Sequence, residues 1–136
     1  MRGDESGSST VELVILTPLL VTFLLFMVAL GRLGLSRAEV NAASADAARA
    51  ASLAPTAGAA PGRAEAAARA TLDSRNITCA SLSVTTDTGA FGHGGQVAVT
   101  VSCGVQLGDL TPLVGGTRTI TSRFVEVTDR YRSYGP

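Results

Sequence analysis

The sequence lacks lysine and tryptophan, and it has one histidine and two cysteines among 136 residues. Without lysine, neither a Schiff-base site nor a lysine-containing phosphate loop can form. One His and two Cys are too few for a convincing zinc site. The 11 basic and 11 acidic residues give a net charge of zero, which argues against a nucleic-acid partner. We therefore expect no catalytic residue, metal, cofactor or small-molecule substrate.

Aromatic residues are also scarce, at 4%, although 46% of the chain is hydrophobic. Much of the apolar content lies in the uncharged segment Leu13–Leu30. As a helix, these residues would extend about 27 Å, close to the thickness of a bilayer core. A segment of this kind near the N-terminus is typical of a cleaved secretory signal, a membrane anchor, or a pilin-type leader followed by an anchor.

The residues before the apolar run fit a secretory signal poorly, because Asp4 and Glu5 oppose Arg2 where such signals are cationic. Glu12 directly abuts the run. A charge at mid-membrane costs about 2.5–3.5 kcal/mol, and less near the interface. Glu12 could be an interfacial residue near a helix N-terminus, where a negative charge is favourable.

A small-residue signal-peptidase site at Ala29-Leu30-Gly31 keeps the secretory alternative open. The apolar run is nevertheless longer than the 7–15 residues usual for a signal. In this alternative, the protein is a secreted small disulfide-bonded binding domain released after Gly31.

Residues 2–18, RGDESGSSTVELVILTP, resemble the TadE-like family, whose members look like minor pilins of the Tad/Flp type IV pilus. The shared features are a glycine-containing leader, a Val-Glu pair, an apolar run and a proline. In type IV pilins, a prepilin peptidase cuts after a glycine, and the fifth residue of the mature chain is glutamate. A cut between Gly7 and Ser8 makes Glu12 the fifth residue, whereas a cut at Gly3 makes it the ninth.

The resemblance implies several partners: prepilin peptidase, other pilin and pseudopilin subunits, the inner-membrane pilus assembly platform and the lipid bilayer. It also implies a role for Glu12. Cleavage would free an α-amine on Ser8, which could meet Glu12 of a neighbouring subunit and set the axial register. Pro18 removes one helical hydrogen bond and favours a kink, and it could equally be a proline simply accommodated in a membrane helix.

Arg32 and Arg37 follow the span closely, so the positive-inside count favours a cytoplasmic C-terminal part. The pilin-like leader and the cysteines favour the opposite orientation. We expect a single-pass cell-membrane protein with a cytoplasmic N-terminus and an extracytoplasmic C-terminal domain, incorporated into the pilus or retained in the membrane.

A helical pattern follows the span from Ser36 to Leu53, with a possible restart at Gly34 and a capping box formed by Ser36 and Glu39. Its small-residue face could pack on a sheet or on other pilin stalks. This predicted face comprises Val40, Ala43, Ala47, Ala50 and Ala51. A second helix is expected at Arg63–Ser74, after a linker; its expected buried residues are Ala66, Ala70 and Leu72.

The remaining sequence predicts three strands, at Ile77–Thr86, Gln96–Leu107 and Thr117–Thr128. The fold class is therefore α+β, with a small antiparallel three-stranded sheet covered on one face by helix. Cys79 and Cys103 fall on adjacent predicted strands and would form a disulfide outside the cytoplasm, or remain two buried thiols.

His93 lies in a glycine-rich turn and is expected to be solvated. A membrane-tethered enzyme would need activity that depends on this histidine, and no base or orienting group accompanies it. The predicted organisation has five parts: leader 1–7, transmembrane helix 8–31, amphipathic stalk helix 32–53, linker 54–62 and extracytoplasmic domain 63–136.

Overall fold

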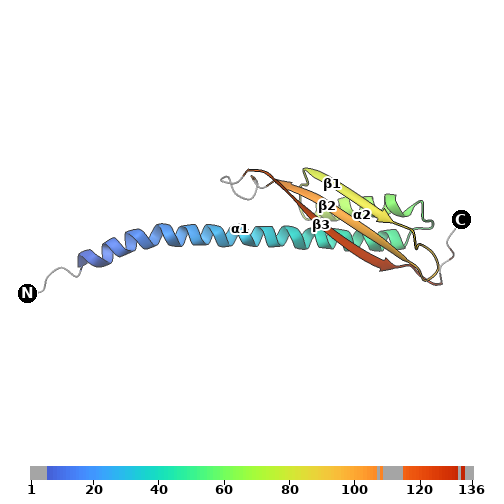
Figure 1. The fold of residues 1–136 in the computed structure, drawn as a ribbon, viewed down its shortest axis with the longest axis horizontal. Coiled ribbons are helices and arrows are strands. Elements are labelled where there is room, and N and C mark those ends of the chain that lie inside the picture. Colours follow the sequence, from blue (N-terminus) through green and yellow to red (C-terminus); the bar gives the residue numbers. More distant parts are fainter. Residues whose placement is uncertain (1–5, 107, 109–114, 132, 134–136) are drawn as a thin grey trace, which may run out of the picture. The chain divides into compact units, whose positions relative to one another are not determined.

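The computed structural model describes residues 6–106, 108, 115–131 and 133, and the side chains from Val11 onward except Leu33. Leader residues Arg2, Gly3, Asp4 and Glu5 therefore lie outside the described residues. The elements are α1 (Ser6–Ser52), α2 (Ala60–Ser74), β1 (Ser81–Asp87), β2 (Gln96–Gln106) and β3 (Thr117–Val127) (Figure 1). The predicted α+β class is confirmed.

The chain divides into two compact units, Met1–Gly34 and Leu35–Pro136. In the first unit, the apolar side chains of α1 are exposed; Leu13, Leu19 and Leu25, for example, are 68%, 67% and 62% exposed. Among the described residues, α1 is the one helix long and apolar enough to cross a membrane. It is compatible with a single-pass membrane anchor.

The predicted helix restart at Gly34 is wrong, because α1 continues through this residue to Ser52. A glycine inside a helix costs only about 1 kcal/mol relative to alanine, and the Ala-rich sequence that follows favours helix. Ser36 is a buried residue within α1, so it does not cap a new helix. Glu39 forms an ion pair with Arg75, the residue that follows α2.

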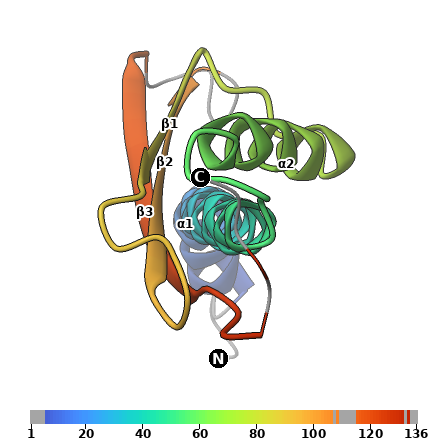
Figure 2. The same ribbon diagram turned by 90° about the vertical axis from the view of Figure 1, so that its right-hand side faces the viewer.

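The sheet of the second unit has the order β1-β2-β3, with both neighbouring pairs antiparallel. Figure 2 shows α1 and α2 on the same side of this sheet. The strictly alternating residues of β2 predicted to face inward are buried: Val97, Val99, Val101, Cys103 and Val105. Leu107, predicted to continue this pattern, lies outside the described residues.

The first strand begins at Ser81 and not at the predicted Ile77, because the N–H of Ile77 is used in ending α2. Asn76 has a positive φ of 55°. Its N–H donates to the Asp73 carbonyl at 3.1 Å, and the Ile77 N–H donates to the Leu72 carbonyl at 3.0 Å. These are the two bonds of a Schellman motif, which ends the helix and delays the strand.

Both helices contribute small residues to the core beneath the sheet. On α1, Val40, Ala43, Ala47 and Ala51 are fully buried, as predicted, while Ala50 is half-buried. The prediction for α2 is wrong at Ala66 and Ala70, which are exposed, and is confirmed only at Leu72. The buried residues of α2 are spaced by four: Ala60, Ala64, Ala68 and Leu72. Ala66 and Ala70 lie on the opposite side of the helix, since each residue advances about 100°.

The second helix also begins earlier than predicted, at Ala60 instead of Arg63. Pro61 lies in its first turn, where the missing N–H costs no helical hydrogen bond.

A close backbone contact requires glycine at position 95, in the turn before β2. A Cβ atom at this position would lie 1.9 Å from the Ala90 carbonyl oxygen, so no other residue fits.

The corrected face of α2 can be tested by enlarging single alanines. Ala68→Leu should lower the free energy of unfolding by about 1–3 kcal/mol, because added methylenes overpack a filled core. Ala66→Leu, two residues away on the exposed side, should change it by no more than about 0.5 kcal/mol. Denaturant unfolding of the full chain in detergent measures both. Equal losses would contradict the observed helix face.

Candidate functional site

The first candidate surface lies on the N-terminal part of α1, around Glu12. Glu12 lines a hollow with the apolar side chains of Leu13, Leu16 and Leu20, and with Thr17. In the described part of the chain, no hydrogen bond or ion pair is recorded for the Glu12 carboxylate. A charge exposed beside an apolar helix surface needs headgroups, water or a cation from another chain.

Gly7 and Ser8, the predicted cleavage residues, both lie within α1. Ser8 precedes Glu12 by four residues, so the two positions lie one above the other on the same helix side. An amine created at Ser8 would therefore begin the helix one turn before the Glu12 carboxylate.

Hydroxyl groups within the apolar run are bonded inside the helix. Thr17 Oγ1 donates to the Leu13 carbonyl at 2.7 Å, and Thr22 Oγ1 donates to the Pro18 carbonyl at 2.8 Å. Pro18 lies inside α1 and has no N–H to donate to the Val14 carbonyl one turn earlier. With the hydroxyls satisfied locally, the surface of the run is suited to lipid or to other apolar helices.

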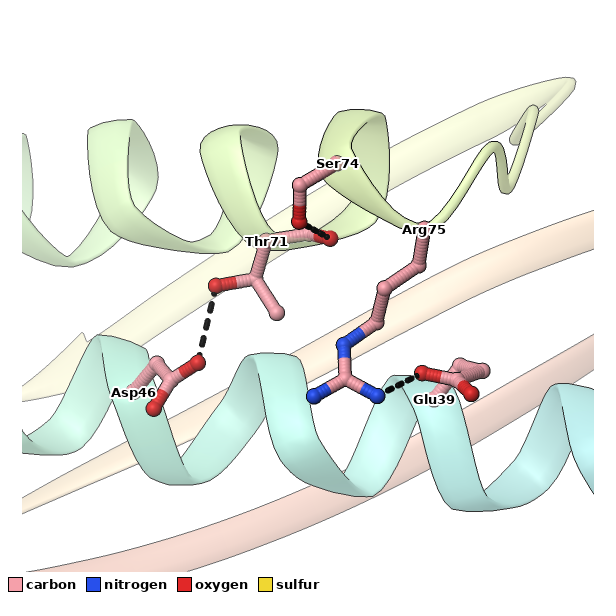
Figure 3. A network of polar contacts seen from close by, with 5 residues as sticks. All are labelled: Glu39, Asp46, Thr71, Ser74 and Arg75. Carbon is pink, nitrogen blue, oxygen red and sulfur yellow. Dashed lines mark hydrogen bonds and ion pairs between the residues drawn. The ribbon is translucent and has the colours of Figure 1, made fainter.

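Polar contacts tie α1 to the rest of the second unit (Figure 3). Glu39 forms an ion pair with Arg75, and Thr71 Oγ1 donates to Asp46 Oδ2 at 2.9 Å. Glu39 and Asp46 are seven residues apart, two turns of helix, and therefore share one side of α1. That spacing is visible in the sequence, but the partners, Thr71 on α2 and Arg75 just after it, are not.

A further contact joins α1 to the edge strand β3. The hydroxyls of Ser44 and Ser122 lie 2.8 Å apart, beneath the sheet. Ser44 is fully buried, and its hydroxyl also bonds the Asn41 carbonyl at 2.8 Å. A buried polar side chain is thus fully partnered, which fixes α1 against β3 without an unsatisfied group.

The structure contains a disulfide between Cys79 and Cys103, with a Cα–Cα distance of 5.3 Å. Cys103 lies on the buried face of β2, but Cys79 precedes β1 and is not on a strand as predicted. The bridge therefore joins the end of the α2–β1 connection to the central strand. Leu82, a partly buried residue that packs against the core, is paired with Cys103 in the register of β1 and β2.

His93 is exposed in the β1–β2 connection, as expected, with its Nδ1 3.4 Å from the Arg130 carbonyl oxygen. The nearby Asp87 accepts a hydrogen bond from the Gly89 N–H at 3.0 Å, which is a turn contact. Among the described residues, no group of three His, Cys, Asp or Glu side chains could hold a metal ion.

The apolar helix with its bordering glutamate can now be compared with known families. Residues 7–49 match the family model described as TadE-like protein. This TadE-like segment confirms the resemblance, and it contains Glu12, Pro18 and most of the buried face of α1. The match indicates a component of a Tad pilus system. The segment excludes α2 and the sheet, and searches of curated proteins and of solved structures found no match.

The disulfide is expected to stabilise the unit Leu35–Pro136, called the outer unit below, because its core consists largely of alanine and valine. Cys79→Ser with Cys103→Ser should lower the free energy of unfolding by about 2–4 kcal/mol. The measurement is denaturant unfolding of the full chain in detergent. The wild-type protein treated with a reductant should lose a similar amount, whereas the reductant should leave the double variant unchanged.

Proposed function

We propose that this protein is a TadE-like minor pilin or pseudopilin, a non-enzymatic structural subunit in the assembly of a Tad/Flp-type pilus or related secretion apparatus. The supporting observation is the position of Glu12. It lies in the TadE-like segment, at the border of an exposed apolar run, and it would be the fifth residue of a chain cut between Gly7 and Ser8.

The exposed apolar run supports association with other helices in a membrane. Its surface has no cover in the described part of the chain, and lipid tails or neighbouring pilin helices would supply one. In the assembled state, Glu12 would face the Ser8 amine of an adjacent subunit. Each charge offsets the cost of desolvating the other, so subunits are favoured only at the axial offset where the charges meet.

Processing would precede this pairing. A prepilin peptidase acting on the cytoplasmic side would cut between Gly7 and Ser8 and free the amine. The C-terminal unit would lie outside the cytoplasm, where the Cys79–Cys103 disulfide is stable. The assembly platform of the inner membrane would then take up the subunit with other pilins and pseudopilins.

The boundary between the two compact units supports the second candidate, a secreted binding domain. The outer unit begins at Leu35, so a signal-peptidase cut after Gly31 would leave all of its residues in the released product. The candidates differ in the mature protein: only the pilin keeps the apolar helix and Glu12.

The charge-pairing role predicts a defect when Glu12 loses its charge. Glu12→Gln should reduce incorporation into the pilus apparatus by at least about tenfold, since removing one member of a buried ion pair costs about 3–5 kcal/mol and 1.4 kcal/mol is already tenfold. The amount of protein in the membrane should stay unchanged. Both quantities can be measured by immunoblotting of sheared pili and of membranes.

Two further variants serve as controls for this experiment. Glu12→Asp keeps the carboxylate and should retain part of the incorporation. Thr17→Val, five residues after Glu12 in the same hollow, removes a hydroxyl that is bonded within its own helix and should incorporate normally. Normal assembly of Glu12→Gln or Glu12→Leu would show that the pairing idea is wrong.

A further inference from the structure

A pocket lined by two arginines lies between the second half of α1 and the start of β3. Its volume is about 290 Å³, and its lining residues are Arg37, Asn41, Arg118, Thr119, Ile120 and Thr121. All of them belong to the unit Leu35–Pro136. The pilin proposal does not use this pocket.

The lining residues favour an anion. Arg118 is opposite Val105 in the sheet register, so its side chain lies on the buried, helix-bearing face of the sheet together with that of Ile120. Arg37 and Asn41 approach from α1, one turn apart. Guanidinium groups remain charged at all relevant pH values and match two phosphate oxygens at once, and the Asn amide adds a donor.

No acidic side chain is among the described lining residues, and the two ion pairs recorded for the described chain involve other arginines, Arg69 and Arg75. The charge of Arg37 and Arg118 is therefore not offset by a described carboxylate. By contrast, the Thr121 hydroxyl is already bonded to Ser102 on the other sheet face. Arg37, Arg118 and Asn41 therefore supply the charged and amide donors for a ligand, and Thr119 adds a hydroxyl.

The sequence position of the pocket points to the source of the anion. Arg37 follows the last residue of the apolar run, Leu30, by seven residues in the same helix. Anionic headgroups attract basic side chains near a membrane surface, by about 1 kcal/mol for each Arg, which corresponds to about a fivefold change in affinity. We propose that this pocket binds a phosphate group, supplied by the headgroup of an anionic phospholipid.

This binding would also explain why arginine follows the span on the side where the positive-inside count disfavours it. A headgroup held by Arg37 and Arg118 would keep the base of the outer unit at the membrane surface before assembly. The site requires that the apolar run lie in a membrane, but it does not require Glu12 to pair with another subunit.

The test uses the full chain in phosphate-free maltoside micelles, titrated with short-chain phosphatidylglycerol by calorimetry. Arg37→Gln and Arg118→Gln should each weaken binding about fivefold. Matched controls are Arg49→Gln on α1 and Arg123→Gln on β3, which are exposed and do not line the pocket. These should bind within twofold of wild type.

Short-chain phosphatidylcholine and inorganic phosphate provide the other arms of the test. Weaker binding of the zwitterionic lipid supports an anionic headgroup. Inorganic phosphate binding that needs both arginines, without phosphatidylglycerol binding, would overturn the lipid as the source. Equal losses in all four variants, or none in any, would overturn the site. If Arg37→Gln or Arg118→Gln weakens lipid binding while pilus incorporation stays normal and still depends on Glu12, the lipid site and the pilin function are separate properties, and both proposals stand.

Discussion

The rest of the structure depends on one constraint: the apolar surface of α1 from Val11 to Leu30 is not covered by the described chain. Water cannot be its final environment, because exposed apolar area costs about 25 cal/mol per Å². A bilayer, or a bundle of similar helices, removes this cost without any contribution from the outer domain. The helix is thus compatible with a membrane anchor, and in the proposed function it would also supply the surface through which subunits associate.

The same helix then serves a different purpose in the second unit. Before Leu35 its apolar residues are exposed leucines and phenylalanines, whereas beyond Leu35 they are a buried Val40 and a series of buried alanines. Small side chains allow α1 and α2 to lie close beneath the sheet, and the polar ties to Arg75, Thr71 and Ser122 fix α1 in that position. The core gains little from large side chains, so the Cys79–Cys103 bridge contributes correspondingly more.

Features with a strong local signal could be predicted from the sequence. The apolar run and the period-two pattern of β2 each required only the spacing of hydrophobic residues, and Leu72 was rightly placed in the core. The wrong face of α2 came from its Ala-rich sequence, in which small residues occur on every side and periodicity cannot choose a face. Ala66 and Ala70 therefore appeared as good as Ala64 and Ala68. The Schellman motif at Asn76 was missed because asparagine replaces the usual glycine.

The candidate functional residues likewise include some that the sequence could predict and some that it could not. Glu12 was evident from the sequence, because an acid at the border of an apolar run is unusual. The Arg37–Arg118 pocket was not, since its two arginines come from distant segments that only the fold brings together.

The central claim is most directly tested by sequencing the N-terminus of the protein isolated from its native membrane. The pilin account predicts Ser8 as the first residue, whereas Arg32 would contradict it and establish cleavage by signal peptidase.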